Sequence, residues 1–492
     1  MSNIGQQSPQ LQHPDRFFIR GRWQAASSNA RIQITSPATE ERFFDVAEAQ
    51  EMDVVRAVAA AREAFDNGPW PRMSHAERAG YLRSLGAQIG KRATALSHIW
   101  AGEMGALYSL AQMIVPSFEG IFGYYAGLAD SFPFIERHDS QVAGAAYLVR
   151  EPVGVVAAII PWNGPLMLAS WKVAPALLAG CTVIIKASPE APGTLYGLAE
   201  AAEAIGLPPG VLNVITAGRD VSELLVRHPG VDKVSFTGST ASGRRVGSIC
   251  GDRIARCTLE LGGKSPAIVL DDYDVESFAR SLAASAPILS GQVCAALTRV
   301  IVTRSRHDAL ADALGSTFEK IRVGNPFDPD SNMGPLATAR QRDRVEGFIA
   351  KGLADGAALV TGGRRPRHLE RGFYVEPTVF GNVDNASAIA REEIFGPVIS
   401  VIPAKDEAHA VELANQSTFG LNSAVFTNDP QRAFDIARRL RIGTVGQNGV
   451  GPDFGIAFGG FKQSGIGREG GKEGLMSYLE TKTILLDRAI TP

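Results

Sequence analysis

The sequence has few cysteines, no excess of charge of one sign and no long apolar run. Four cysteines, at positions 181, 250, 257 and 294, are too few for a disulfide scaffold in 492 residues, which is typical of the reducing cytoplasm. Lysine plus arginine number 49 and aspartate plus glutamate 51, so the basic surplus of a nucleic-acid binder is missing. We therefore expect a cytoplasmic protein without a nucleic-acid partner.

Membrane spans, secretion signals and metal sites also find no support. No segment reaches the roughly 18 apolar residues needed to cross a bilayer. The most apolar stretches, 153–160 and 173–185, are short or interrupted by proline, glycine and threonine. The first ten residues lack the basic start and apolar run of a signal peptide, and the 8 histidines form no metal-ligand spacing.

Short β-branched runs alternate with helical patterns through the centre of the chain. The runs cover 153–160, 182–186, 211–215 and 233–236. This alternation predicts a parallel, doubly wound sheet whose strand-end loops share the edge where ligands bind. A second α/β series begins at 265–270, and a chain of 492 residues exceeds one core, so two or three domains are expected.

The segments on either side of this α/β region have other patterns. Residues 52–128 have helical apolar spacing, 130–149 form an extended or hairpin excursion, and 475–486 end the chain as a strand.

Two residues carry the pattern of nucleophilic catalysis. Cys294, in the segment GQVC, follows a glycine that predicts an exposed backbone, and Glu260 is a lone carboxylate between leucines at a strand end. A cysteine nucleophile needs a base to form thiolate or to activate water, and a partly desolvated glutamate has a raised pKa. No histidine sits in comparable company, which disfavours a cysteine–histidine protease.

Polar residues at other strand ends are weaker signals. Gly238 and Ser239 end a strand and open a helix, where free amides would favour a phosphate. An ordinary strand–helix turn with a Ser/Thr cap is the alternative, so alone this signal is weak. Lys186 is either a ligand contact or a solvated strand-end lysine. Asn163 is either an oxyanion donor or a turn former.

Taken in order, six segments of the chain resemble the aldehyde dehydrogenase superfamily from about residue 15 onward. Each segment alone is modest evidence, whereas six in the correct order are specific. The segments are PWN at 161–163, FTGST at 236–240, LELGGKSP at 259–266, GQVC at 291–294, EEIFGPV at 392–398 and FGGFKQSGIGRE at 458–469.

The resemblance implies a catalytic role for three residues. Cys294 matches the nucleophile that attacks the aldehyde, and its backbone amide with the Asn163 side chain would hold the oxyanion. Glu260 matches the base that activates water to hydrolyse the resulting thioester. Glu480 matches a second carboxylate sometimes given a proton-relay role.

The resemblance also implies a nicotinamide dinucleotide site. Lys186 would contact the adenosine ribose, Gly238 and Ser239 the pyrophosphate, and Leu261 the nicotinamide carboxamide. The full set matched to this site is Pro161, Trp162, Lys186, Gly238, Ser239, Leu261, Glu393 and Phe395. Many NAD-preferring relatives carry a glutamate that repels a 2′-phosphate where this chain has Pro189, with Glu190 one position later. This departure leaves NADP open beside NAD, which is favoured.

The positions matched to the aldehyde tunnel are uncharged. Gly164 stands where relatives often have an aromatic residue, which would widen the tunnel. We expect a bulky apolar, aromatic or unsaturated aldehyde rather than a carboxylated semialdehyde. The tunnel set is Gly164, Leu168, Trp171, Val293, Ala295 and Phe458, beside the small GVGP loop at 449–452.

The implied fold is α/β, with a Rossmann-like cofactor domain, an α/β catalytic domain and a small β oligomerisation arm. The expected boundaries are 1–129 and 150–261 for the dinucleotide-binding domain, 262–474 for the catalytic domain, and 130–149 and 475–492 for the arm. An unpaired terminal strand is a liability in a monomer, so we expect a homodimer or homotetramer.

Two other functions stay open. A dehydrogenase that passes the thioester to coenzyme A usually lacks the water-activating carboxylate, whereas Glu260 is present. A non-catalytic binding or structural relative would be expected to lose Cys294, Glu260 or Asn163, and all three are retained.

Overall fold

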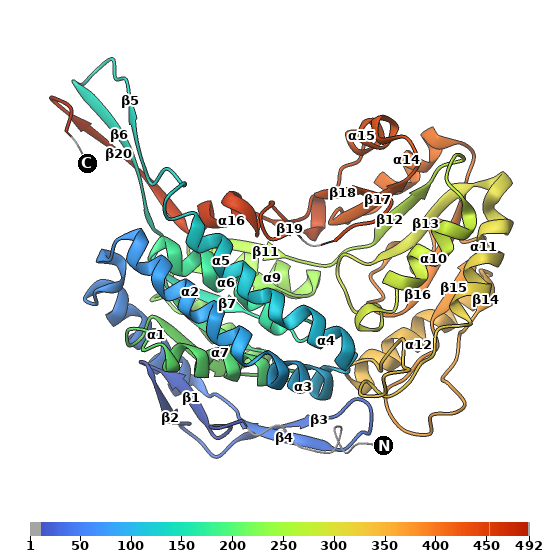
Figure 1. Ribbon diagram of the computed structural model, residues 1–492, viewed down its shortest axis with the longest axis horizontal. Coiled ribbons are helices and arrows are strands. Elements are labelled where there is room, and N and C mark those ends of the chain that lie inside the picture. The colour runs from blue at the N-terminus through green and yellow to red at the C-terminus, as the bar shows by residue number, and fades with distance from the viewer. Residues whose placement is uncertain (1–10, 452, 491–492) are drawn as a thin grey trace.

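The computed structural model describes residues 11–451 and 453–490, which form two α/β lobes and a narrow β arm (Figure 1). This arrangement confirms the predicted fold class. Residues 1–10 of the predicted cofactor domain, Pro452 of the GVGP loop and residues 491–492 of the predicted arm lie outside the described residues.

The first lobe is built on an eight-stranded sheet with the order β19-β11-β10-β7-β8-β9-β1-β2. The chain runs from β7 to β8 and β9 on one side, then returns to the other side of β7 with β10 and β11. Its topological switch point therefore lies between the carboxyl ends of β7 and β10, where such sheets bind ligands. The parallel strands are β7 (Val155–Ile159), β8 (Thr182–Ala187), β9 (Leu212–Thr216), β10 (Lys233–Thr237) and β11 (Arg256–Glu260), and the antiparallel ones are β1 (Arg16–Ile19), β2 (Arg22–Ala25) and β19 (Gly465–Ile466).

Helices cover both faces of this sheet, which explains why its central strands read as continuous apolar runs. Val156 and Ala158 of β7 face one helical layer, while Val155 and Ala157 face the other. The first layer contains α2 (His75–Lys91), α3 (Ala93–Met104), α4 (Tyr108–Ile114), α5 (Phe118–Gly127), α6 (Pro165–Ala179) and α7 (Gly193–Ala204), and the second contains α1 (Glu51–Asp66), α8 (Arg219–Arg227) and α9 (Thr240–Asp252).

The second lobe holds a seven-stranded sheet with the order β14-β15-β16-β13-β12-β17-β18. All neighbours are parallel except the edge pair β14 and β15. The strands are β12 (Ser265–Val269), β13 (Leu297–Thr303), β14 (Ala358–Thr361), β15 (Thr378–Gly381), β16 (Val398–Ala404), β17 (Asn422–Phe426) and β18 (Thr444–Gln447). The covering helices are α10 (Val275–Ser285) and α11 (Arg304–Phe318) on one face, and α12 (Ala339–Ala354), α13 (Ala388–Arg391), α14 (Glu407–Asn415) and α15 (Pro430–Ala437) on the other.

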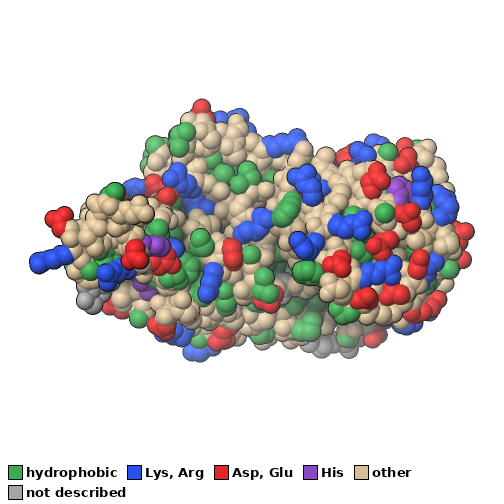
Figure 2. Space-filling view, turned by 90° about the horizontal axis from the view of Figure 1, so that it is seen from above, with side chains coloured by type: hydrophobic (Ala, Val, Ile, Leu, Met, Phe, Trp, Pro, Cys, Tyr) green, Lys and Arg blue, Asp and Glu red, His purple; other side chains and the backbone are tan. Residues whose placement is uncertain are grey.

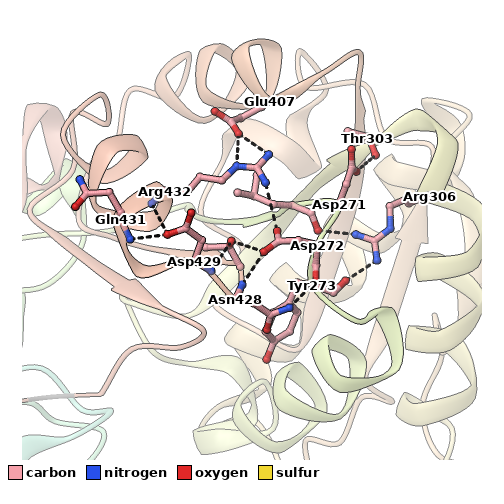
Figure 3. A network of polar contacts seen from close by, with 12 residues as sticks. Asp271, Asp272, Tyr273, Thr303, Arg306, Glu407, Asn428, Asp429, Gln431 and Arg432 are labelled. Atoms are coloured by element: carbon pink, nitrogen blue, oxygen red, sulfur yellow. Dashed lines mark hydrogen bonds and ion pairs between the residues drawn. The ribbon is translucent and has the colours of Figure 1, made fainter.

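The switch point of the second sheet is closed by its own side chains (Figure 3). Here β12 lies between β13 and β17, and Asp272 after β12 accepts hydrogen bonds from the Thr427 hydroxyl at 2.7 Å and the Asn428 amide at 2.8 Å. Arg432 pairs with both Asp272, at 3.5 Å, and Glu407, at 2.7 Å. The loops at this switch point are therefore joined to one another, and the side chains next to Cys294 in the cavity between the lobes come from the opposite, amino-terminal edge.

The arm is a three-stranded antiparallel sheet with the order β20-β6-β5, which projects from the first lobe (Figure 1). The predicted hairpin forms β5 (Ile135–His138) and β6 (Ala145–Pro152), and β20 (Leu479–Leu486) pairs along β6. One detail of the prediction is wrong: Leu475 and Met476 end helix α16 (Gly471–Met476), so the terminal strand starts four residues later than expected. Also, β19 falls in the range predicted for the catalytic domain but is an edge strand of the first sheet.

A small hairpin of β3 (Arg31–Thr35) and β4 (Arg42–Ala47) runs along the base of the molecule (Figure 1). Across residues 11–451 and 453–490, no helix has the length and apolarity needed to cross a membrane, and no three histidine, cysteine, aspartate or glutamate side chains gather as metal ligands. On the face shown in Figure 2, basic side chains are interspersed with acidic ones rather than gathered in a single field.

Candidate active site

A single cavity of about 1780 Å³ lies between the lobes and brings together nearly all the residues predicted from the sequence. It exceeds the roughly 300–1,000 Å³ of common ligand pockets, so it has room for two ligands at once. Every predicted cofactor and tunnel residue lines it, as do Cys294 and Asn163. Glu260 is not part of its wall and lies buried behind it, with 4% of its surface exposed.

The switch point of the first sheet forms one end of this cavity. The segment 161–163 follows β7, while Gly238 and Ser239 follow β10. The Ser239 hydroxyl caps the 13-residue helix α9 by accepting a hydrogen bond from the Ser242 amide at 3.3 Å. The remaining free amides of this helix terminus give the cavity an anion-binding end.

Lys186, at the end of β8, adds a buried cation to the same region. Its side chain is 7% exposed, and burial lowers its pKa to about 8, whereas the nearby charge of Glu190 raises it. These groups fit the phosphate and ribose end of a dinucleotide. A nucleotide bound here would meet amides, hydroxyls and one amine that are already in place.

The segment that carries Cys294 is held in a strained turn. Leu289, Ser290 and Gly291 have φ values of 49°, 54° and 73°, a left-handed conformation that the first two residues rarely adopt. The Ser290 hydroxyl secures the turn through the carbonyls of Gly334 at 2.8 Å and Pro335 at 3.0 Å. The neighbouring strands do not need this conformation, so its effect is to aim the residues that follow at the cavity.

The Cys294 thiol is half-buried and strongly disfavours its charged form. Burial, followed by the carboxylates of Glu393 and Glu260, raises the pKa of the thiol to about 12. The backbone amides of Ala295 and Cys294 act in the opposite direction, which places them beside the sulfur. These two amides are therefore positioned to stabilise a negative charge that develops next to Cys294.

Asn163 connects the two lobes beside the nucleophile. Its buried Nδ2 donates a hydrogen bond to the Gln292 carbonyl at 3.0 Å, and its backbone carbonyl accepts from Trp100 Nε1 at 3.1 Å. An asparagine amide has a second N–H group to donate. The hydrogen bond to Gln292, two residues before Cys294, holds the Asn163 amide near the nucleophile. This amide is therefore suited to bind an oxyanion.

Glu260 ends β11 and lies between two backbone segments. Neither of its carboxyl oxygens has a hydrogen-bond partner among the described residues. Burial, and after it the charge of Glu469, raises the pKa of Glu260 well above its usual range, while Lys172 and Arg468 oppose the shift. The backbone of Gly459 lies so close that a Cβ atom there would be 2.7 Å from Oε1.

A buried ion pair next to Glu260 was not identified from the sequence. Lys172 of α6 pairs with Glu469, and its Nζ also donates to the Thr237 hydroxyl at 2.7 Å. Both charged side chains are almost fully buried, at 0% and 2% exposure. The sequence does hold a signal for Lys172, because a lysine is unusual inside the apolar segment LMLASWKVAPALLA. Glu469 is the last residue of the glycine-rich segment FGGFKQSGIGRE.

Glu480 does not take the position suggested by the resemblance. It lies on the arm strand β20, is 46% exposed and pairs with Arg256 at 2.6 Å. Arg256 begins β11 and Glu260 ends it, about 13 Å away along an extended strand. The carboxylate beside Glu260 is therefore Glu469, not Glu480.

Two further residues predicted to bind the cofactor, Glu393 and Phe395, precede the amino end of β16 and line the cavity. Glu393 Oε1 accepts from the Gly263 amide at 3.1 Å, and burial raises the pKa of Glu393 to about 7. Phe395 has a φ of 61° and meets Trp162 of the first lobe edge to face, with ring centroids 5.4 Å apart. Leu261 forms the adjoining wall, with its amide bound to the Ser464 carbonyl at 2.9 Å.

The predicted tunnel residues form the apolar end of the cavity. Trp171 contacts the rings of Phe458 and Phe454 at centroid distances of 5.3 and 5.8 Å. Beside Gly164 there is open space, because a Cβ atom there would meet only Met167 Cε at 3.7 Å. Leu168, Val293 and Ala295 complete the predicted walls, and Trp100, Leu110 and Ile114 add further apolar surface.

One charged residue also borders this end. Asp453 lines the cavity and lies next to the GVGP loop, and its carboxylate accepts a hydrogen bond from the Gly455 amide at 2.8 Å. The prediction that no tunnel position is charged omitted this residue.

Two facing α/β lobes, with a nucleotide-type switch point on one and a cysteine loop on the other, define the class as the aldehyde dehydrogenase fold. The model of the family described as "Aldehyde dehydrogenase family" matches residues 23–484. The chain belongs to this family and is an aldehyde dehydrogenase by descent.

Individual relatives cover almost the whole chain. A geranial dehydrogenase of Castellaniella defragrans is 42% identical over 96% of this chain and 98% of its own. A chloroplastic betaine aldehyde dehydrogenase of Amaranthus hypochondriacus is 38% identical over 96% of both chains. The crystal structure of a Mycobacterium tuberculosis aldehyde dehydrogenase complexed with NAD⁺ superposes with a TM-score of 0.95, at 42% identity over 97% of this chain and 99% of the other.

Proposed function

We propose that this enzyme oxidises an aldehyde to a carboxylic acid through Cys294, with NAD as its cofactor. The observation that carries the proposal is the single cavity in which a switch-point nucleotide site, a cysteine and an oxyanion-binding amide meet. The predicted domain boundaries at residues 130, 150 and 262 are part of this proposal, whereas the pairing of β19 with β11 returns the chain to the first lobe before residue 475. The bound nicotinamide ring supplies the acceptor for the hydride removed from the substrate.

The first step is attack of the Cys294 sulfur on the aldehyde carbon. The carbonyl oxygen gains charge, which Asn163 Nδ2 and the Cys294 amide stabilise. Because burial holds the thiol protonated, a base must take its proton as the bond forms. Loss of hydride from this adduct leaves a thioester on sulfur.

The second step is hydrolysis, for which Glu260 serves as the base. A carboxyl with a raised pKa both accepts a proton from water and returns it near neutral pH. Its unpartnered oxygens are free to accept a hydrogen bond from that water, and Lys172 with Glu469 forms a polar pair behind it. Release of the acid then restores the thiol.

We propose a bulky apolar or unsaturated aldehyde as the substrate. The aromatic walls at Trp171 and Phe458, and the open space at Gly164, support this choice. The relative named for geranial acts, by its name, on such a compound. The betaine aldehyde relative indicates a cationic aldehyde instead, for which Asp453 is the available counter-ion.

The decisive experiment follows absorbance at 340 nm with NAD and a panel of aldehydes that includes geranial, octanal, benzaldehyde, betaine aldehyde and succinic semialdehyde. We expect NADH formation that requires Cys294, needs no coenzyme A and is fastest with the apolar aldehydes. A requirement for coenzyme A would instead show an acylating enzyme. Absence of NADH with every aldehyde, while NAD still binds, would favour the non-catalytic reading.

The variant Asp453→Asn separates the two substrate classes. It should leave kcat/KM for geranial unchanged and lower it only for a cationic aldehyde. If betaine aldehyde is the best substrate and loses efficiency in this variant, the apolar assignment is wrong.

We also propose that the arm pairs with a second copy of the chain. Strand β20 has one bonded neighbour, and exposed apolar side chains at Ile135, Leu485 and Ile490 lie along the arm. Unpaired edge strands favour association. Light scattering should give a dimer or tetramer mass in solution, and a monomer would contradict the proposal.

A further inference from the structure

Glu190 and Arg340 form an ion pair across the cavity, between the two lobes. Glu190 follows β8 of the first lobe, and Arg340 lies in the first turn of α12 in the second. Their Oε1 and Nη2 atoms are 3.0 Å apart, and both residues line the cavity. The glutamate side chain is 20% exposed and the arginine side chain 76%.

The carboxylate is fixed in place from two sides. The Ser188 hydroxyl donates a hydrogen bond to Glu190 Oε2, while Arg340 holds Oε1. Glu190 also lies close enough to the buried amine of Lys186 to raise the pKa of that lysine. It is therefore a positioned acidic group rather than a solvated surface side chain.

The topology gives this position a meaning for the cofactor. β8 is the second strand of the doubly wound sheet, after β7. In such sheets, an acidic residue beyond the second strand binds the ribose 2′-hydroxyl of NAD, and a nearby arginine accommodates the 2′-phosphate of NADP. Both kinds of residue are present here, and they are bound to each other.

We propose that the Glu190–Arg340 pair sets the choice between NAD and NADP and that Arg340 is a latent phosphate-binding residue. This inference rests on the proposed function. While Glu190 is ionised, its charge repels a 2′-phosphate and holds Arg340 away from it. When the carboxylate is removed, the planar guanidinium is free to bind a phosphate through two hydrogen bonds.

Two other cations at this end, Arg245 and Lys186, are less available. Arg245 is held by Glu223 through hydrogen bonds of 2.7 and 3.0 Å, and Lys186 is buried with a pKa lowered by its surroundings. Arg219 begins α8 and also lines the cavity. Arg340 differs from the buried Lys186 in its exposure, and from Arg219 and Arg245 in being paired with the carboxylate that follows β8.

The test measures NAD and NADP binding by isothermal titration calorimetry, without aldehyde. We compare the wild type, Glu190→Gln, Arg340→Met and the double variant. Glu190→Gln should tighten NADP binding roughly tenfold or more, as expected for charge-assisted hydrogen bonds to a phosphate, and change NAD binding much less. The double variant should lose this gain.

A matched control is Glu346→Gln, which removes a similar carboxylate on α12 that pairs with Arg365 outside the cavity. It should leave the Kd of both cofactors unchanged. An unaltered NADP/NAD ratio in Glu190→Gln would overturn the inference, and a gain that persists in the double variant would assign the phosphate to another cation such as Arg219. Failure of the wild type to bind either cofactor would refute the proposed function instead.

Discussion

Lys172 is completely buried and forms an ion pair with Glu469, at the back of the carboxyl group of Glu260. The three residues come from α6, from the loop after β19 and from the end of β11. The buried cation is thus paired with one carboxyl group and acts on the other through its charge alone. Burial, and after it the charge of Glu469, raises the pKa of Glu260, while Glu469 keeps Lys172 as its partner.

Replacement of this buried cation should destabilise the fold. Lys172→Met leaves Glu469 uncompensated in the interior, which typically costs about 3–5 kcal/mol. We expect urea unfolding to show a loss of this size in the free energy of unfolding. Lys482→Met is the control, because Lys482 pairs with Glu151 at the surface and should cost at most about 1 kcal/mol. Equal losses in both variants would show that the buried pair has no special role.

The neighbouring charge should also control the pH dependence of turnover. Glu469 raises the pKa of Glu260, so removing that charge lowers the pKa. Glu260 acts as a base only above its pKa, and the acidic limb of the kcat–pH profile of Glu469→Gln should therefore move to lower pH. Steady-state rates from pH 5 to 9 measure the shift. A limb that stays in place, or moves to higher pH, would mean that the two carboxyl groups are not coupled.

Local features of the fold could be predicted from the sequence because their signals are local. The apolar run of β7 indicates a strand covered by helices on both faces. Ser239 is the N-cap of α9, and serine is among the residues favoured at that position. The arm hairpin was also visible as alternating residues after the helices. The end of α16 was missed because Leu475 and Met476 fit a strand equally well.

Residues that act through distant contacts were harder to predict. Glu469 reaches Glu260 because β19 pairs antiparallel with β11 and the chain then turns back through glycines with positive φ at 467, 470 and 471. Nothing in the spacing shows that return, and the resemblance points to Glu480 instead. Likewise, the site uses the amino edge of the second sheet, while Asp272 and its partners join the loops at the other edge.

A glycine next to the nucleophile should tolerate no side chain. A Cβ atom at Gly263 would lie 2.3 Å from the Cys294 carbonyl oxygen, so Gly263→Ala must displace the catalytic loop. Misplacement by about 1 Å can cost on the order of 100-fold in rate, and we expect kcat/KM to fall by about that factor. Gly347→Ala, in the open on α12, should keep full activity and gain roughly 0.5–1 kcal/mol of stability. An active Gly263→Ala enzyme would show that the loop adapts freely.

The free thiol should react slowly and become more reactive with pH. Because the pKa of Cys294 is raised to about 12, its thiolate fraction grows about tenfold for each pH unit below that value. Alkylation by iodoacetamide, followed by mass spectrometry of the Cys294 peptide, should show this slope between pH 7 and 9. Glu393→Gln removes one charge that raises the pKa and should accelerate the reaction at every pH. A rate independent of pH would mean that the thiolate already exists at neutrality.

The open space beside Gly164 should determine the largest aldehyde that enters. Its φ of −143° suits any residue, and a side chain there would extend toward Met167 without meeting another atom within 4 Å at Cβ. Gly164→Phe should therefore fold normally and narrow the tunnel. We expect KM for geranial to rise by about tenfold or more, and KM for acetaldehyde to stay the same, because only the bulky chain needs the filled space. Gly164→Ala is the matched control and should change neither value by more than about threefold. Equal effects of the phenylalanine on both aldehydes would mean that Gly164 lies outside the substrate path, and the apolar tunnel would then have to be sought along Trp171 and Phe458.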